Sequence, residues 1–301
     1  MINEPGEHTE VKPMDTQRRK DRASFLLSAP MIAWTMLFVG ATIAYVVALS
    51  FLKRNPDGYG VVMQFTLENY AKLANANYLE VFRRTLALGL QTTLICVALG
   101  YPFGYCMART APKWRTALML LVIVPFWTNA LIRIYGWRIL LVGNGPVNSL
   151  LMVLGLIDKP LKLMNTHGAV ILGMVYGLLP FMILPVYTSV EKMDWGMADA
   201  GRDLGASPAR VFLTVTLPLT APGLMTGCVL VFVPSLALFF MSDLLGGPND
   251  ILIGNLVHDQ LLKSRDWPFA AALSVVLLVI TWAIMTVYRR LGGKDTDLTL
   301  F

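Results

Sequence analysis

Charged residues are scarce in this chain of 301 residues, at 15% of the total, whereas hydrophobic residues make up 55%. An average soluble domain has about a quarter of its residues charged. The composition therefore excludes an ordinary soluble domain and favours a protein embedded in a bilayer. Cysteine is also rare. Cys96, Cys106 and Cys228 all lie inside apolar segments without CxxC or Cys/His spacing, which argues against a disulfide framework or a metal site.

Sequence signatures of enzymes are missing as well. The chain has no GxxxxGKS/T phosphate-binding loop, no HExxH zinc motif and no GxSxG nucleophile motif, and its three histidines, His8, His167 and His258, stand far apart in the sequence. We therefore expect no catalytic residue, no cofactor and no metal. If ATP drives this protein, another subunit must hydrolyse it.

Long apolar runs dominate what is present. A helix needs roughly 20 apolar residues to cross the hydrocarbon layer of a bilayer, and no alternating pattern suggests a barrel. The chain is therefore predicted to be an all-α membrane protein with six transmembrane helices. They are expected at Phe25–Phe51, Thr85–Met107, Ala117–Leu141, Ala169–Val190, Gly223–Leu245 and Pro268–Tyr288. This single membrane domain, residues 25–290, would lie between tails at residues 1–24 and 291–301.

Lys and Arg are unevenly distributed between the two sides of this predicted bundle. Six spans place both termini on one side, together with the loop at residues 191–222. That side has more Lys and Arg than the other, and such an excess marks the cytoplasmic side. We therefore expect both termini and this loop to be cytoplasmic. This bias also explains the net charge of +6 better than a nucleic-acid partner does, because the basic residues form no patch.

A polar stretch at residues 199–218 interrupts the apolar blocks and reads DAGRDLGASPARVFLTVTLP. Ser207 followed by Pro208 fits a helix N-cap with proline at the first helical position. Gly205 suits the left-handed turn that ends a preceding helix. The pattern predicts two short helices that meet at an elbow. The first helix would present a shallow apolar face formed by Met197, Ala200 and Leu204.

The spacing within this stretch resembles the EAA loop of binding-protein-dependent ABC importer permeases. The matching positions are Asp199, Ala200, Gly201, Gly205, Leu217 and Pro218. Asp199 stands where the family usually has Glu, and Gly201 where it has Ala. The resemblance implies the permease fold of type I ABC importers, with this loop as a cytoplasmic coupling helix seated in a cleft of an ATPase subunit. On composition alone, the stretch could be an amphipathic connector on the membrane surface.

The predicted third span contains polar and charged residues at a depth where lipid disfavours them. A charged side chain there costs about 3 kcal/mol or more unless it faces a cavity or a partner. Asn129, Arg133 and Gly136 share one helical face, which would therefore look inward. Alternatively, Arg133 and Arg138 lie near the outer interface and extend towards it. The aromatic belt of that interface would then consist of Trp127, Tyr135 and Trp137.

Several motifs make the resemblance more specific. Four segments are very similar to those of polyamine importer permeases: LLVIVPFWTNALIRIYGW, LPFMILPVYTSVEKMD, MSDLLGGPNDILIGN and RDWPFAAA. This resemblance covers most of the chain after Phe65. It implies uptake of spermidine or putrescine across the bacterial inner membrane by alternating access. The implied partners are a second homologous permease, a dimer of ATPase subunits and a periplasmic polyamine-binding protein.

Passage of a polyamine needs weak, replaceable attraction for its ammonium groups, from carboxylates, polar oxygens and aromatic faces. The residues expected along the path are Trp127, Thr128, Asn129, Tyr176 and Asp243. Asp243 could equally be a helix-end carboxylate paired with Arg133 or with a backbone amide. Other functions stay open: an importer of the same architecture for another small solute, an ATPase-independent channel or carrier, and a membrane assembly factor.

Overall fold

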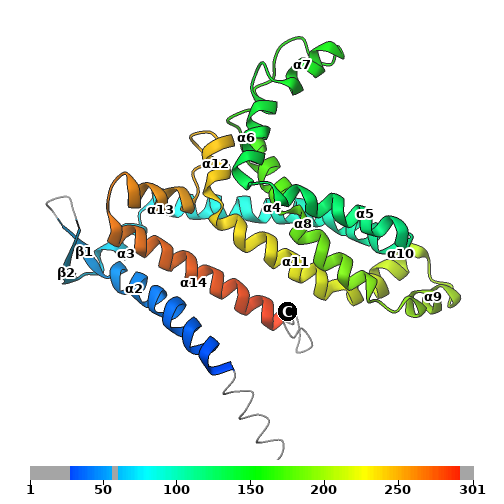
Figure 1. The fold of residues 1–301 in the computed structure, drawn as a ribbon, viewed down its shortest axis with the longest axis horizontal. Coiled ribbons are helices and arrows are strands. Elements are labelled where there is room, and N and C mark those ends of the chain that lie inside the picture. The colour runs from blue at the N-terminus through cyan, green and yellow to red at the C-terminus, as the bar shows by residue number, and fades with distance from the viewer. Residues whose placement is uncertain (1–27, 56–59, 292–301) are drawn as a thin grey trace, which may run out of the picture.

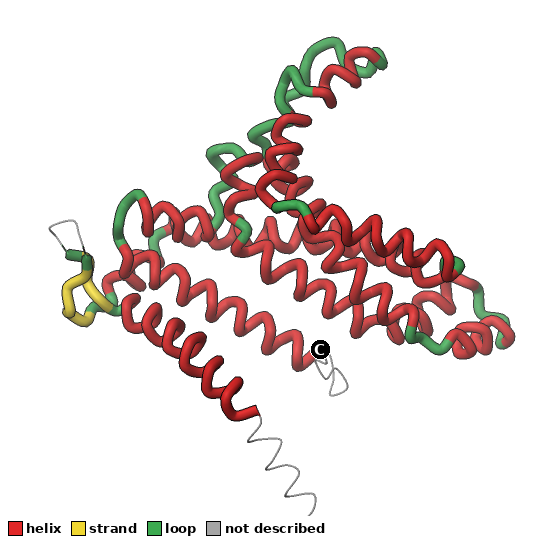
Figure 2. Tube along the Cα trace, viewed as in Figure 1, coloured by secondary structure: helices red, strands yellow, loops and turns green. Residues whose placement is uncertain are grey.

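The computed structural model describes residues 28–55 and 60–291, and most of this part of the chain is helical (Figures 1 and 2). The predicted tails, residues 1–24 and 291–301, lie outside it except for Leu291, as do the first three residues of the predicted first span. The helices up to the elbow are η1 (Met36–Gly40), α2 (Ala41–Ser50), α3 (Glu68–Leu73), α4 (Ala76–Arg109), α5 (Pro112–Ile123), η2 (Val124–Trp127), α6 (Ala130–Leu141), α7 (Pro146–Val153), α8 (His167–Glu191) and α9 (Trp195–Asp203). The later helices are α10 (Pro208–Val211), η3 (Phe212–Thr216), α11 (Leu217–Ala237), α12 (Phe239–Leu245), α13 (Ile253–Leu262) and α14 (Trp267–Leu291).

Three long helices, α4, α8 and α11, pack together at the centre of the bundle. Glycines spaced four residues apart let helix backbones approach closely, and two such pairs face α8: Gly100 and Gly104 in α4, and Gly223 and Gly227 in α11. A β-carbon at Gly100 would lie 2.7 Å from Cγ of Met182 in α8, and one at Gly227 would lie 2.7 Å from its Sδ. Met182 is fully buried between the two helices.

A second layer, α2 and α14, lies along one flank of this core (Figure 1). The helix that ends with α2, Ser28–Ser50, is apolar enough to cross a membrane, and no residue of its most apolar window is buried within the chain. Strands β1 (Leu52–Arg54) and β2 (Val61–Phe65) follow it as an antiparallel hairpin. Asn69 in α3 anchors this region, because its Nδ2 donates to the carbonyls of Ser50 and Leu52, both at 2.9 Å.

The third span, Ala117–Leu141, was predicted as one continuous helix, and this prediction is wrong. After α5 and the 3-10 turn η2, the chain bends by 94° between Trp127 and Ala130. Pro125 lacks the N–H that would continue the helical ladder, and Thr128 takes an extended backbone with φ −83° and ψ 149°. Hydropathy records only the apolar run and cannot show such a break. Consequently α6 and α7 project from the bundle as an arm (Figure 1).

The predicted fifth span, Gly223–Leu245, is shifted towards the elbow. Its helical run covers Pro208–Ala237 and stops at Leu238, whose φ of −76° and ψ of 61° are not helical. The π-helical turn η3, closed by a hydrogen bond from the Leu217 N–H to the Phe212 carbonyl, joins α10 to α11 without a gap. The last part of the apolar run forms the separate helix α12. Uniform apolarity does not reveal either boundary.

The remaining spans are confirmed with somewhat different bounds. The predicted Thr85–Met107 lies inside α4, Ala169–Val190 lies inside α8, and Pro268–Tyr288 lies inside α14. The described part of the chain thus holds five helices long and apolar enough to cross a membrane, or six when the bent pair around Trp127 counts as one span.

Candidate functional site

The predicted elbow forms at the end of the bundle opposite the β-hairpin (Figure 1). Asp194 caps α9 by accepting a hydrogen bond from a backbone N–H two residues on, at 2.9 Å. At the other end, the Gly205 N–H donates to the Arg202 carbonyl at 2.8 Å, and the Ala206 N–H donates to the Gly201 carbonyl at 3.2 Å. These two bonds define a Schellman motif, which needs a left-handed residue. Gly205, with φ +85°, supplies it as predicted.

Ser207 begins the second helix of the elbow. Its Oγ accepts a hydrogen bond from the Arg210 N–H at 3.3 Å, and Pro208 occupies the first helical position, both as predicted. The inside of the elbow is closed by a buried apolar cluster of Met193, Ala198 and Val211. Because α10 continues through η3 into α11, the elbow is joined directly to a core helix.

The outer face of α9 is apolar and open. Leu204 is 89% exposed and Met197 is 53% exposed, and Ala200 beside them is exposed as well. Asp199 and Arg202 form an ion pair of 2.9 Å next to this face, and its exposure limits what it adds to stability. The shallow apolar face predicted for this helix is therefore present. Exposed apolar residues grouped in this way are typical of a contact surface.

The other predicted coupling residues divide between surface and interior. Gly205 and Pro218 are exposed. Gly201 lies against α10, where an added β-carbon would touch Val211 at 3.4 Å. Leu217 packs against the main core. The first pair is thus accessible to another molecule, whereas Gly201 packs the two helices of the elbow together and Leu217 packs against the bundle.

Aromatic residues that the sequence did not single out tie the elbow to α4. The rings of Tyr105 and Trp195 lie edge to face with centroids 6.0 Å apart, and the Arg109 guanidinium lies 5.1 Å from the Trp195 ring. Phe212 in η3 packs edge to face against Tyr101 and Tyr105, at 5.9 and 6.0 Å. Such aromatic pairs contribute about 1 kcal/mol each beyond their buried area. The four-residue spacing of the two tyrosines was the signal that could have found this contact.

Three predicted path residues, Trp127, Thr128 and Asn129, lie together at the bend of the third span. Asn129 caps α6, because its Oδ1 accepts a hydrogen bond from the Leu131 N–H at 2.8 Å. Thr128 donates from Oγ1 to the Pro125 carbonyl at 2.8 Å. Both polar side chains therefore satisfy the backbone where the helix breaks. The ring of Trp127 is left at the surface, 79% exposed.

The two arginines of the third span occupy different environments. The guanidinium carbon of Arg133 lies 4.4 Å from the centroid of the Phe126 ring and 5.8 Å from that of Tyr176, the fourth predicted path residue. Arg138 is exposed. Arg133 and Gly136 belong to the helical face that was predicted to look inward. Arg133 does point into the protein, whereas a β-carbon at Gly136 would meet nothing within 4 Å.

Asp243 stands apart from the other four path residues. It is exposed on α12, and its Oδ1 accepts a hydrogen bond of 2.5 Å from Nδ2 of Asn255. Asn255 in turn caps α13 by accepting from the Leu252 N–H at 2.9 Å. The partner of Asp243 is thus a side-chain amide rather than Arg133 or a backbone amide. The structure does not gather the five predicted residues into one site.

An ion pair lies one helical turn further along α13. Lys263 donates to Asp259 at 2.7 Å. This hydrogen bond lowers the pKa of Asp259 and raises the pKa of Lys263, and the nearby charge of Asp243 adds to the second effect. The surroundings of Asp243 therefore contain a cation as well as carboxylates.

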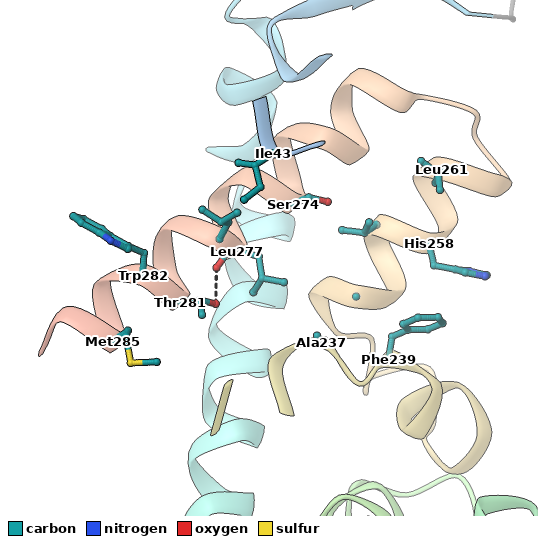
Figure 3. A pocket seen from close by; sticks show the side chains of 13 residues that line it. Ile43, Ala237, Phe239, His258, Leu261, Ser274, Leu277, Thr281, Trp282 and Met285 are labelled. Carbon is teal, nitrogen blue, oxygen red and sulfur yellow. Dashed lines mark hydrogen bonds between the residues drawn. The ribbon is translucent and has the colours of Figure 1, made fainter. Parts of the chain in front are cut away.

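An apolar groove of about 810 Å³ opens between α13, α14 and the start of α12 (Figure 3). Figure 3 shows Thr281 and Trp282 on α14, with Phe239 and His258 across the groove. The rings of Phe239 and His258 stack with centroids 5.0 Å apart. The groove offers little to a charged ligand. Within residues 28–55 and 60–291, no group of three His, Cys, Asp or Glu residues is placed to hold a metal ion.

Long apolar helices, a broken span and an exposed elbow continuous with a core helix define the class of an integral membrane protein. Residues 100–293 match the family described as "Binding-protein-dependent transport system inner membrane component". The chain belongs to this family. It is therefore a multi-pass inner-membrane transport component rather than an enzyme.

Relatives and solved structures agree with this assignment. The chain is 46% identical over 271 residues to the spermidine/putrescine transport system permease protein PotB of Escherichia coli (strain K12), covering 89% of this chain and 98% of the relative. It is 42% identical over 262 residues to PotB of Haemophilus influenzae, covering 87% and 91%. A solved bacterial ABC transporter that imports alginate matches with a TM-score of 0.71 at 16% identity, covering 95% of this chain and all of that chain. At that identity the likeness shows the fold, and it confirms the predicted permease fold of type I ABC importers.

Proposed function

We propose that this chain is the permease subunit of an ATP-driven importer that takes up polyamines, spermidine or putrescine, across the bacterial inner membrane. The observation that carries the proposal is the 46% identity to permeases named for spermidine and putrescine, which extends over 89% of the chain. Similarity of this length includes both the elbow and the broken third span. The importer would also contain a second homologous permease, two ATPase subunits and a periplasmic polyamine-binding protein.

The elbow is the proposed contact with the ATPase subunit. Leu204 and Met197 offer an apolar surface that a cleft in a partner could bury. Two capping motifs fix the ends of α9, so this surface moves as a unit. Its displacement would reach the core by two routes: covalently through α10 and η3 into α11, and through the ring contacts of Trp195 and Phe212 with α4. The proposed coupling residues are Asp199, Ala200, Gly201, Gly205, Leu217 and Pro218.

The proposed orientation places the elbow and both termini in the cytoplasm. The excess of Lys and Arg on that side supports it. The direction of α14 agrees, because this helix runs from α13 towards the end of the bundle at which α9 lies (Figure 1). The hairpin and α13 would then face the periplasm, where a binding protein delivers its cargo.

Alternating access is the transport mechanism that this arrangement supports. Closure of the ATPase subunits would push α9 and, with it, α11 against α8, and release after hydrolysis would return them. The proposed path runs near the bend of the third span, with Trp127, Thr128, Asn129 and Tyr176 nearby, and Asp243 nearer to the outer face. Oxygens and aromatic faces bind ammonium groups weakly enough to release them.

Uptake of labelled spermidine into proteoliposomes that hold the complete transporter tests this function. The wild-type complex should take up spermidine only with ATP and the binding protein. Asp199→Lys should abolish uptake, because it reverses a charge beside the contact face, whereas the matched variant Asp199→Glu should keep it. If an assembled wild-type complex takes up no polyamine, the proposal that polyamines are the substrate is refuted. Normal uptake by Asp199→Lys would refute the role of the elbow.

A further inference from the structure

We propose that Arg133 is a tethered cation that occupies an aromatic site in this conformation, and that an ammonium group of the substrate takes its place during transport. The inference rests on the proposed polyamine function. Its starting point is the position of the Arg133 guanidinium, 4.4 Å from the ring centroid of Phe126 and 5.8 Å from that of Tyr176. Both distances lie within the range of about 6 Å over which an aromatic face attracts a cation.

The aromatic site does not depend on Arg133 for its shape. Phe126 packs edge to face against Phe181 with centroids 5.9 Å apart, and Tyr176 packs in the same way against Trp137 at 5.5 Å. The four rings come from η2, α6 and α8, three elements that meet beside the bend of the third span. Because each ring that faces the guanidinium is braced by a second ring, the site would persist after Arg133 leaves it.

The hydrogen bonding of the Arg133 guanidinium is incomplete. The Nε and Nη1 atoms of Arg133 are buried, and neither has a hydrogen-bond partner within the described residues. A buried N–H without an acceptor loses the hydrogen bonds that water would give it. Arg133 is thus held mainly by two aromatic faces, and a second cation that offers the same attraction can compete with it.

The location of Arg133 suits a displaceable group. It lies in the first turn of α6, where its N–H donates to the carbonyl of Asn129 at 3.2 Å, directly after the bend of 94°. A change of side-chain rotamer at Arg133 would withdraw the guanidinium from the rings and leave Trp137, on the same helix, in place. In the present position its charge repels an arriving polycation, so the site is closed to substrate. Its return after passage would expel the bound ammonium group and prevent the tight binding that stalls transport.

Another molecule could instead accept hydrogen bonds from Nε and Nη1 of Arg133. A carboxylate of a neighbouring subunit would accept a hydrogen bond from Nε or from Nη1 and make Arg133 an assembly residue. Removal of the charge distinguishes the two possibilities. A tethered competitor should be dispensable for assembly, and its loss should improve polyamine binding, whereas loss of an assembly residue should weaken the complex.

Direct binding of labelled spermidine to the complete purified transporter, without binding protein and without ATP, tests the inference. Arg133→Met should increase the affinity on the order of three- to thirtyfold, the range of a cation–π contact. Arg133→Lys keeps a positive charge and should show less gain in affinity than Arg133→Met. Arg138→Met removes the same charge from an exposed position on the same helix and should behave as wild type. Adding Tyr176→Leu to Arg133→Met should abolish the gain.

The outcomes separate this inference from the proposed function. If the wild-type complex takes up spermidine but Arg133→Met binds it no better, the tethered cation is refuted and the function stands. If the complex assembles with Arg133→Lys but not with Arg133→Met, the tethered cation is refuted and a carboxylate of a neighbouring subunit is the partner of Arg133. If Arg138→Met gains as much affinity, general charge rather than the aromatic site is responsible, and the inference is also refuted. If the wild-type complex takes up no spermidine, the proposed function itself is refuted.

Discussion

Gly223 of α11 lies directly against the backbone of α8, where a β-carbon on it would come within 2.6 Å of the carbonyl oxygen of Pro185. Gly223→Ala should therefore force α11 away from α8 and destabilise the protein by about 1–3 kcal/mol, the usual cost of overpacking a core. A lower midpoint of thermal unfolding in detergent, together with less folded protein in membranes, would show this.

The matched control for this substitution is Gly168→Ala in α8. There the nearest atom to the added β-carbon, Oγ1 of Thr166, would be 3.9 Å away, an ordinary contact. This variant should unfold at the wild-type temperature. Equal stability of both variants would mean that α8 and α11 do not pack as closely as described.

The left-handed backbone at Gly205 leads to a prediction that depends on conformation and not on size. An added side chain there would meet nothing within 4 Å, yet φ is +85°. Gly205→Ala should destabilise the elbow by about 1–2 kcal/mol, the cost of a left-handed conformation for an ordinary residue. Asn visits this conformation more readily, so Gly205→Asn should retain more ATP-coupled uptake than Gly205→Ala although it is larger. The reverse order would point to a steric contact at this position.

Leu204 should bind the ATPase subunit without stabilising the permease itself, because it is 89% exposed. Burial of a leucine side chain is worth about 1.5–3 kcal/mol, so Leu204→Ser should weaken binding of the ATPase subunit about ten- to a hundredfold. The unfolding temperature of the isolated permease should not change. Leu156→Ser, at an exposed leucine near the projecting arm, is the control and should leave ATPase binding intact. An unchanged affinity for Leu204→Ser would place the contact elsewhere.

Local chemistry explains why the elbow could be predicted from the sequence. Ser207 before Pro208 and a glycine at position 205 act on the backbone within a few residues, so their pattern is visible without the fold. Most membrane spans were predictable for a similar reason, since a sufficient apolar run is a local property. The break at Thr128 was not, because a proline three residues earlier is tolerated in many membrane helices.

The site around Arg133 could be predicted only in part. Its buried charge suggested an inward direction, but the rings of Phe126 and Tyr176 meet it from two elements that are far apart in sequence. The same limit applies to Asp243. Its partner, Asn255, lies on the next helix and is chosen by the turn after α12, which apolarity alone does not reveal.

Asp243 combines a structural contact with a proposed role in the path, and substitutions can separate the two. Asp243→Asn keeps an oxygen that accepts from Asn255 but removes the charge, so the unfolding temperature should stay close to wild type. The spermidine concentration for half-maximal uptake should rise up to about fivefold, as expected from an exposed charge interaction. Asn255→Ala instead removes the cap of α13 and should cost about 1–3 kcal/mol of stability. Asp259→Asn, which removes a nearby carboxylate already paired with Lys263, is the control and should not change uptake. If Asp243→Asn also leaves uptake unchanged, Asp243 serves only to hold α12 against α13, and the negative charge that attracts the substrate must come from another subunit.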